Sequence, residues 1–222
     1  MDNLTAMASW SGGKDSCLAY YKAIKKGYDV KRLLNFVSRE YGRCCFHGIQ
    51  RDLIKLQAEL IGIPLVQKEV TADMKEYEKE FKETVLEFKD IESMVFGDIY
   101  LDEHKDWVER VCKDIGIMPI EPLWNVPAID VAEEFVDLGF KSIVVSCQAD
   151  KFEKDFVGRI IDKELINELQ EENICPCGEN GEFHTFVVDG PIFKRRIKIL
   201  ESEPVLREGF WKYWFLDIKG YR

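Results

Sequence analysis

The segment with the clearest chemistry is a glycine-rich hexapeptide near the start of the chain: Ser11, Gly12, Gly13, Lys14, Asp15 and Ser16. The glycines allow the backbone to approach an anion closely, and the lysine adds a full positive charge. The serine hydroxyls can donate hydrogen bonds to phosphate oxygens. Because the hexapeptide follows an apolar run and opens a helical pattern, unpaired N–H groups and the helix dipole also favour a phosphate there. We therefore predict a phosphate-binding loop.

This loop differs from the Walker A loop. Asp15 follows Lys14 where that pattern requires serine or threonine, and Ala8 stands where it requires its first glycine. The alternative without chemistry is a plain strand-to-helix turn in which the glycines serve only geometry. The full hexapeptide, in a strand–loop–helix context, favours the phosphate site over that alternative.

A second group of polar residues lies far along the chain, in the segment from Cys177 to Phe186. If this segment is extended, Glu182 and His184 point to one face, while Glu179 lies in the glycine turn before them. Carboxylates there can hold an ammonium ion, and the imidazole can take its proton. A lone histidine is more often structural, but the motif around this one favours function.

Two short motifs lie between these segments, Gly97-Asp98-Ile99 and Glu121-Pro122-Leu123-Trp124. Asp98 follows a predicted strand, at the edge where open α/β sheets bind ligands. Its carboxylate could hold Mg²⁺ or orient a nucleotide. A helix-capping aspartate is an equally good interpretation.

The elements that must position these residues alternate in the first half of the chain. Apolar runs predict strands at residues 4–8, 30–37, 65–68 and 93–96, and helical spacing predicts helices at 15–26, 49–61, 74–88 and 102–115. Such alternation indicates a parallel sheet with helices on both faces. We therefore predict an α/β domain.

The second half has a different pattern. Helices are predicted to about residue 138 and over 156–169, with a strand at 142–145 between them. Strand patterns then follow one another at 185–188, 193–200 and 210–218. We predict a smaller α+β domain and divide the chain into residues 1–124 and 125–222.

The hexapeptide resembles the pyrophosphate loop of the N-type ATP pyrophosphatases. The three other motifs are similar to those of one branch, the diphthine–ammonia ligases. The resemblance implies a five-stranded parallel, adenine-nucleotide-binding (HUP-like) sheet that binds ATP through residues 11–16 and Asp98, with Mg²⁺ at Asp98. It also implies that Lys14, Asp15, Glu182 and His184 act in catalysis.

The implied reaction amidates the diphthine side chain of elongation factor 2 with ammonium to diphthamide, splitting ATP into AMP and pyrophosphate. Diphthine carries a trimethylammonium group, which aromatic faces commonly hold. Trp124, Tyr100 and Phe183 lie nearest the motifs, although core packing is the simpler interpretation of each. The expected substrate-binding residues are Tyr100, Trp124, Glu179, Glu182, His184 and Thr185.

Bulk composition limits the partners. The 222 residues carry a net charge of −10, which argues against broad nucleic-acid binding. The basic run at 194–198 is interpreted as a solvated strand face that could steer an acidic partner. No apolar run suits a membrane span and the N-terminus lacks a signal-peptide pattern, so we expect a cytoplasmic protein whose seven cysteines are free thiols.

Several alternatives stay open. Cys44 and Cys45 with His47, or Cys175 and Cys177, would bind a metal only if both clusters met in the fold. A tRNA-modifying adenylating enzyme and a nucleotide-binding sensor are the competing functions. Since the chain has no room for a glutaminase domain, free ammonium is the expected nitrogen donor. A homodimer is one alternative assembly, and in a host without diphthine a related small carboxylate would be the acceptor.

Overall fold

The computed structural model describes residues 4–45, 47–208 and 212–222. Its first half forms a five-stranded sheet in which all neighbouring strands are parallel, in the order β3-β2-β1-β4-β5. This confirms the predicted parallel sheet. The strands are β1 (Thr5–Ser9), β2 (Asp29–Ser38), β3 (Leu65–Val70), β4 (Ser93–Val95) and β5 (Met118–Ile120).

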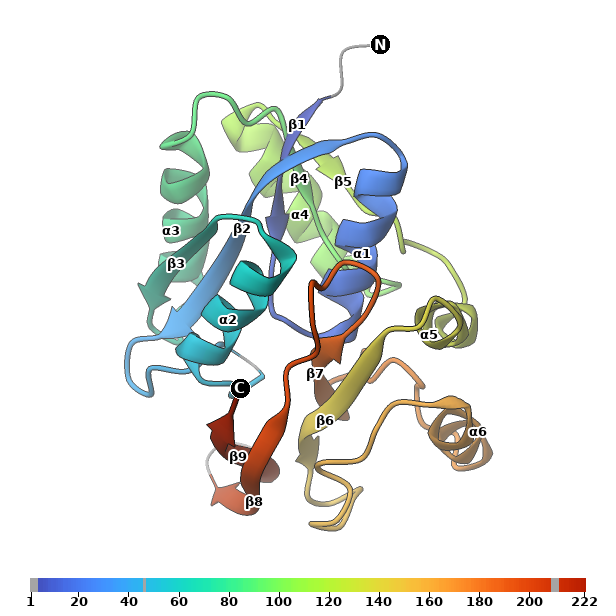
Figure 1. Ribbon diagram of the computed structural model, residues 1–222. Helices are drawn as coiled ribbons and strands as arrows, with labels where there is room; N and C mark the ends of the chain where they lie inside the picture. The colour runs from blue at the N-terminus through green and yellow to red at the C-terminus, as the bar shows by residue number, and fades with distance from the viewer. Residues whose placement is uncertain (1–3, 46, 209–211) are drawn as a thin grey trace.

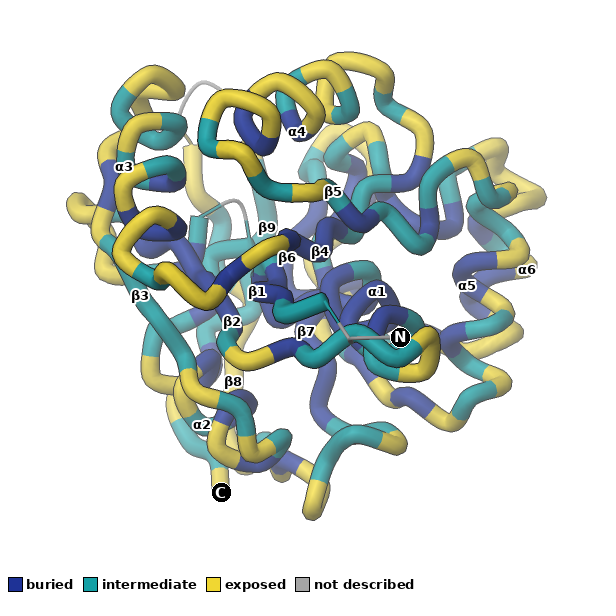
Figure 2. The backbone as a smooth tube through the Cα atoms, turned by 90° about the horizontal axis from the view of Figure 1, so that it is seen from above, coloured by how far each residue is buried: buried dark blue, intermediate teal, exposed yellow. Residues whose placement is uncertain are grey.

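Four helices cover this sheet, two on each face (Figure 1). They are α1 (Lys14–Lys25), α2 (Arg51–Ile61), α3 (Met74–Leu86) and α4 (Asp102–Ile115). Successive residues of β1 point to opposite faces: Ala6 and Ala8 share a core with residues of α1 and α2, whereas Met7 packs with residues of α3 and α4. Seen from above, buried segments fill the centre and the outer turns of α3 and α4 are exposed (Figure 2).

The strand order fixes where a ligand can enter. The chain proceeds from β1 outward to β3, then returns to place β4 on the other side of β1. Connections from β1 and β4 therefore leave in opposite directions, which opens a crevice at the carboxyl ends of these two strands. The predicted phosphate loop follows β1, and Asp98 follows β4.

The second sheet is antiparallel, in the order β7-β6-β9-β8. It comprises β6 (Lys141–Gln148), β7 (Phe183–Asp189), β8 (Ile199–Glu208) and β9 (Lys212–Tyr221), and is joined by α5 (Ala128–Asp137) and α6 (Lys163–Glu171). The carboxyl edge of the first sheet faces it, and β7 contacts α1 (Figure 1). Because Phe140 meets Tyr21 of α1 edge to face at 5.7 Å, one apolar core joins the two sheets.

One helix begins later in the structure than the sequence predicted. Residues 156–169 were expected to be helical, but α6 starts at Lys163, with the Asp162 side chain accepting from the N–H of Leu165 as its N-cap. Gly158 upstream adopts φ +93°, and Ile160 pairs with Ile143 of β6. The segment before Asp162 is therefore held against the sheet as a loop, which its apolar spacing did not reveal.

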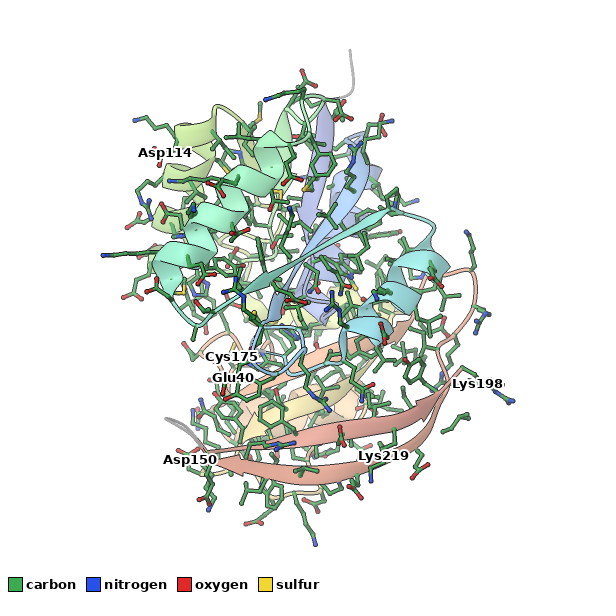
Figure 3. The ribbon with its side chains drawn as sticks, turned by 90° about the vertical axis from the view of Figure 1, so that its left-hand side faces the viewer. Glu40, Asp114, Asp150, Cys175, Lys198 and Lys219 are labelled. Carbon is green, nitrogen blue, oxygen red and sulfur yellow. The ribbon has the colours of Figure 1, made fainter. Side chains whose placement is uncertain are left out.

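The C-terminal strands also differ from the prediction. Residues 193–200 do not form one strand: β8 begins at Ile199, and the N–H groups of Lys194 and Ile197 bond to the carbonyls of Leu60 and Val188. The basic run is thus a loop, from which Lys198 projects outward (Figure 3). Strand β5 was not predicted, and Phe210 and Trp211 of the last predicted strand lie outside the described residues.

Two further observations concern the whole described chain. None of its helices has the length and apolarity that a membrane crossing needs. All seven cysteines lie within the described ranges and are free thiols.

Candidate functional site

The loop after β1 is shaped to leave helix N–H groups available. Gly12 adopts φ +79°, which a side chain disfavours, and Gly13 is the N-cap of α1. Gly13 has no side chain to accept from the first helical turn, and uncapped N–H groups at a helix start favour an anion. The hydroxyl of Ser16 donates to the Gly13 carbonyl at 3.0 Å, and that of Ser11 accepts from the Gly13 N–H at 3.3 Å.

Strand β7 holds this loop directly. The Lys14 N–H donates to the Thr185 hydroxyl at 3.0 Å, and the Val187 N–H donates to the Gly12 carbonyl at 2.9 Å. The buried amide of Gln57 donates to the carbonyls of Gly12 and Val187, at 3.0 and 2.8 Å. The phosphate loop and strand β7 are therefore joined by hydrogen bonds, although Lys14 and Thr185 lie 171 residues apart in the sequence.

The Lys14 ammonium is buried inside this structure, with 2% exposure. It lies 2.7 Å from the Asp15 carboxylate and donates to the Cys177 carbonyl. Burial, the largest single influence, opposes its charge, but Asp15, Cys177 and Glu179 together outweigh burial and raise the pKa of Lys14 above its ordinary value. Lys14 therefore keeps its positive charge at neutral pH.

A histidine pair, not predicted as such, lies over the loop. The Nδ1 of His47 is 3.1 Å from the Thr185 carbonyl, to which it must donate, and a Cβ on Gly13 would lie 2.6 Å from the His47 ring. The ring of His184 lies 4.7 Å from that of His47. Burial lowers the pKa of His47 to about 4, aided by the charge of Lys14, and lowers the pKa of His184 well below its usual value.

Sequence reasoning considered His47 only as a metal ligand beside Cys44. It reaches the site through a contact across 138 residues, and no spacing in the sequence signals such a contact. The cysteines have other partners: Cys44 Sγ accepts from the Asn35 amide at 3.1 Å, and Cys177 Sγ donates to the Ala128 carbonyl at 3.2 Å.

The opposite side of the crevice carries Asp98, His104 and Glu179. The Asp98 carboxylate is 2.9 Å from His104 Nδ1, and the Ile99 N–H donates to Glu179 at 3.0 Å. Asp98 does not cap α4, whose N-cap is Leu101. Within the described ranges these three side chains form a group whose potential ligand atoms lie within 4.8 Å of one another, and the group contains no cysteine.

This side adjoins the phosphate loop through Gly97. A Cβ at that position would lie 2.9 Å from the carbonyl carbon of Asp15 and 3.0 Å from the N–H nitrogen of Ser16. Only glycine allows β4 to end so close to the first turn of α1. Asp98 is therefore held beside Asp15.

The remaining predicted residues separate into different environments. Glu182 is buried and turns back to accept from the N–H and side-chain amide of Asn180, both at 3.0 Å, whereas His184 lies against His47. The same amide donates to the Tyr100 hydroxyl at 3.1 Å. Glu182 and His184 thus have different partners rather than a shared one.

The three aromatic candidates are also unlike one another. Trp124 is half-buried, and the Lys105 ammonium already lies 4.4 Å above its ring. Tyr100 is exposed at the rim. Phe183 is 1% exposed and packs edge to face against Phe156, 5.8 Å away, so it belongs to the core.

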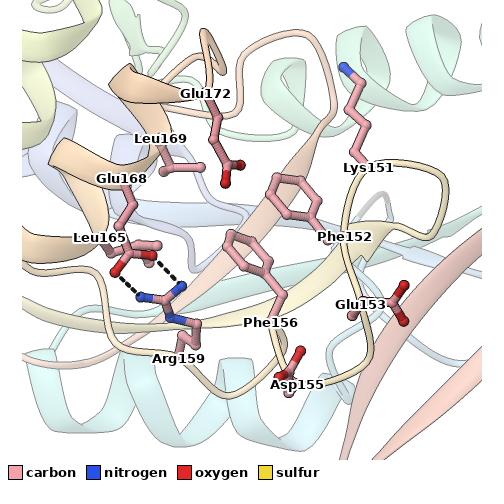
Figure 4. A pocket seen from close by; sticks show the side chains of 10 residues that line it. All are labelled: Lys151, Phe152, Glu153, Asp155, Phe156, Arg159, Leu165, Glu168, Leu169 and Glu172. Carbon is pink, nitrogen blue, oxygen red and sulfur yellow. Dashed lines mark hydrogen bonds and ion pairs between the residues drawn. The ribbon is translucent and has the colours of Figure 1, made fainter.

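A separate cavity of about 370 Å³ lies between the loop at 151–159 and α6 (Figure 4). Phe152 and Phe156 stack along its wall, and Arg159 forms a two-pronged ion pair with Glu168 at 2.6 and 2.9 Å. None of the predicted site residues lines it, so the crevice at β1 and β4 remains the candidate site.

The chain matches two family models over most of its length. The diphthamide synthase N-terminal domain matches residues 4–119, and the C-terminal domain matches residues 127–221. Diphthine–ammonia ligases of Mus musculus and Homo sapiens are 28% and 27% identical, with 88% of this chain and 83% of each relative covered. The Schizosaccharomyces pombe enzyme of that name is 26% identical over 95% of this chain and 38% of its own length.

The fold is also similar to a crystal structure described as a predicted subunit of a tRNA methyltransferase from Methanocaldococcus jannaschii. The alignment covers 85% of this chain and 98% of the other chain. Its TM-score is 0.48 and its identity 17%, which is too low to support a functional conclusion.

Proposed function

The chain belongs to the diphthamide synthase family, and from this premise we propose that it is the ATP-dependent ligase that amidates diphthine on elongation factor 2 with ammonium. The main observation in support of the proposal is the direct contact between the phosphate loop and the C-terminal motif, residues 177–186. Lys14 touches both Thr185 and Cys177, so the groups that bind a triphosphate and those beside an acceptor share one crevice.

The chemistry requires activation because a carboxylate is a poor electrophile. In the proposed reaction, a carboxylate oxygen of diphthine attacks the α-phosphorus of ATP, and the bond to the β-phosphate breaks to release pyrophosphate. Ammonium first loses a proton to solvent, and the ammonia that forms attacks the acyl carbon. AMP leaves with the electron pair of the broken C–O bond, and the attached nitrogen loses a second proton to solvent to give the amide. Lys14 and the first-turn N–H groups of α1 stabilise the charge that gathers on the phosphates.

Magnesium fits the oxygen donors beside the loop. Asp15 and Asp98 present carboxylates close to where the phosphates bind, and Mg²⁺ prefers such oxygen ligands together with substrate phosphates. We assign Asp98 as the principal protein ligand. When bound, the ion supplies positive charge that offsets the charge of the triphosphate.

Ammonium binding is assigned to the carboxylates of the C-terminal motif. Glu179 faces the crevice, and burial raises its pKa, which an adjacent cation would oppose. Glu182 supports it by ordering Asn180. Because His184 is a weak base in its buried setting, we propose that its neutral ring accepts a hydrogen bond from the incoming nitrogen rather than holding the proton.

We retain the division at residue 124/125 as a proposal, with the first part binding ATP and the second the protein substrate. Tyr100 and Trp124 lie at the rim, where a long substrate side chain would enter. The cytoplasmic location and a homodimer stay predictions.

The test is release of pyrophosphate and AMP from ATP with ammonium and diphthine-bearing elongation factor 2. We expect release that depends on the acceptor and matches diphthamide formation by mass spectrometry. ATP cleavage with a tRNA acceptor but without amidation would favour the tRNA-modifying alternative. Tight ATP binding with no cleavage under any of these conditions would favour the sensor.

A further inference from the structure

The basic run at residues 194–198 lies beside an apolar groove on the C-terminal sheet. The groove has a volume of about 430 Å³. Its floor is aliphatic and is formed by buried or half-buried residues of β6, β7, β8 and β9 and of the loop before β8: Ile143, Val188, Ile197, Ile199 and Leu216. Arg196 and Lys198, which are exposed, line its rim. The groove therefore combines an apolar floor with a cationic rim.

Backbone hydrogen bonds fix the loop that carries these two cations. The N–H of Ile197 donates to the Val188 carbonyl at 2.8 Å, and the side chain of Ile197 is only 1% exposed. Lys198 and Arg222 exchange N–H···O=C bonds of 2.9 and 3.0 Å. Because Arg196 and Lys198 flank a buried residue, their side chains start from a fixed backbone, and Lys198 projects outward in Figure 3.

The charges of the basic run are not balanced by neighbouring carboxylates. Its four cations are all exposed: Lys194, Arg195, Arg196 and Lys198. None of them forms an ion pair with a carboxylate in the part of the chain that the structure describes, whereas Lys219 of β9 pairs with Glu203 at 2.7 Å. Since the whole chain has a net charge of −10, this run is a local cationic surface on an acidic protein. Such a surface favours an anionic partner.

The aliphatic side chains indicate which kind of anionic partner fits. Leu200, which lines the groove, is 60% exposed, and Ile160, which pairs with Ile143 of the floor, is 45% exposed. Among the described residues that line the groove, none is aromatic. Surfaces that bind single-stranded nucleic acid commonly stack bases on aromatic rings. An aliphatic floor therefore favours a protein segment over a nucleic acid.

Strand β7 connects the groove to the crevice that holds the phosphate loop. The N–H of Val187 donates to the Gly12 carbonyl of that loop at 2.9 Å, and the next residue, Val188, lines the groove. A protein bound in the groove would therefore contact the strand that holds the phosphate loop. A second copy of this chain fits less well, because residues near the axis of a two-fold dimer meet their own copies and these cations would repel one another.

We propose that this groove docks an acidic segment of the protein substrate, in which aliphatic side chains alternate with carboxylates. The aliphatic side chains occupy the floor, and the carboxylates pair with Arg196 and Lys198 at the rim. Arginine suits this role because its guanidinium can bind one carboxylate through two parallel hydrogen bonds. The identity of the partner, elongation factor 2, rests on the proposed function. The groove binds the body of the substrate, while the crevice binds the side chain that reacts.

The test combines binding and kinetics with diphthine-bearing elongation factor 2 and the full chain. Surface plasmon resonance gives the Kd, and the amidation rate gives kcat and the KM values. Arg196→Glu combined with Lys198→Glu reverses both charges at the rim. We expect the Kd and the KM for elongation factor 2 to rise at least about tenfold, with kcat and the KM for ATP unchanged. Added salt should weaken binding of the wild type more than that of the variant, because salt screens exposed charges.

Matched variants separate the groove from general effects of charge and apolarity. Lys89→Glu combined with Lys113→Glu makes the same change in net charge at exposed lysines of the first half of the chain, and should bind as the wild type does. Leu200→Ser removes an aliphatic contact and should raise the KM for elongation factor 2 by about fivefold. Leu86→Ser, at the end of α3 and 46% exposed, should not change it. Thermal unfolding of each variant checks folding.

Three results would overturn the inference. The first is an unchanged Kd for elongation factor 2 in the double variant at the rim. The second is loss of tRNA binding by that variant while its affinity for elongation factor 2 is retained, which would identify a nucleic-acid surface. The third is conversion of a dimeric wild type into a monomer by the same two substitutions in sedimentation velocity, with the affinity for elongation factor 2 retained, which would identify a contact between copies of the chain.

The inference and the proposed function can fail separately. Binding of elongation factor 2 that depends on the two rim cations, with no amidation of diphthine, would support the docking groove and reject the ligase. Amidation with the same KM for elongation factor 2 in the wild type and the double variant would support the ligase and reject the docking groove.

Discussion

The two sides of the crevice are built differently. The side formed by the phosphate loop and β7 is buried: Gln57 and Thr185 are 0% and 2% exposed, and both hydrogen-bond to the loop. On the opposite side, the side chain of His104 is 53% exposed and carboxylates outnumber cations. This difference agrees with the proposal that the first side binds the phosphates and the second binds cations.

The largest effect is expected from a change in the phosphate loop. Lys14→Ala removes the buried ammonium that faces the phosphates, so pyrophosphate release should fall by about 10²–10³-fold, as when one preorganised charge-stabilising donor is lost. The measurement is the initial rate of pyrophosphate release at saturating ATP, ammonium and acceptor.

Lys25→Ala is the matched control, since it removes an exposed lysine at the other end of the same helix and should leave the rate unchanged. Thermal unfolding of both variants separates lost chemistry from lost folding. A folded Lys14→Ala variant that retains the wild-type rate would contradict the assignment of this side to phosphate.

The second prediction tests how closely the two sides must approach. In Gly97→Ala the new Cβ would lie 2.9 Å from the Asp15 carbonyl carbon, which is backbone and cannot rotate away. We expect a loss of about 1–3 kcal/mol in unfolding free energy. Gly220→Ala in β9 meets nothing closer than 3.3 Å and should lose less. Chemical denaturation measures both, and equal losses would contradict a special role for Gly97.

Local sequence patterns predicted most of the first sheet. The helix expected at 102–115 agrees with α4, and the phosphate loop falls between β1 and α1 as expected. Those elements are specified by short-range periodicity and by turn residues. Strand β5 was missed because it is only three residues long and one of them is a proline.

What the sequence did not predict depends on distant contacts. His47 and Thr185 meet across 138 residues, and His104 joins the site only because α4 begins beside Asp98. The turn of Glu182 toward Asn180 is likewise decided by the glycine turn before β7, not by strand alternation. Motifs therefore indicated which segments matter, while packing decided which side chains meet.

The third prediction uses the histidines to compare the two sides. The unfolded pKa of histidine is about 6.5, and burial depresses the pKa of His47 to about 4. The unfolded chain therefore binds more protons between these values, so stability from His47 is present above pH 6.5 and is lost as pH falls through 4. His184 acts in the same direction. We expect about 1 kcal/mol of loss from His47 at pH 5.5 relative to pH 7.5.

His104 should act in the opposite direction. Its hydrogen bond to Asp98 raises its pKa, so its contribution is present below pH 6.5 and is lost as pH rises. Urea denaturation from pH 5 to 8 should show a weaker acid dependence in His47→Asn and a stronger one in His104→Asn than in the wild type. The same change in both variants would show that the two sides do not differ electrostatically.

The smallest expected effect concerns the rim of the cation side. The Lys105 ammonium lies 4.4 Å above the Trp124 ring, so this face already accepts a cation and could accept a trimethylammonium group. At about 0.5–2 kcal/mol per contact, Trp124→Ala should raise the KM for diphthine-bearing substrate by about 2–30-fold while the KM for ATP stays near the wild-type value. Trp124→Phe keeps an aromatic face and should raise the KM for the diphthine-bearing substrate less than Trp124→Ala does. The control is Tyr41→Ala, which removes a side chain that is 70% exposed and lies outside the site. Equal rises in both KM values would show that Trp124 stabilises the structure of the crevice and does not bind the trimethylammonium group.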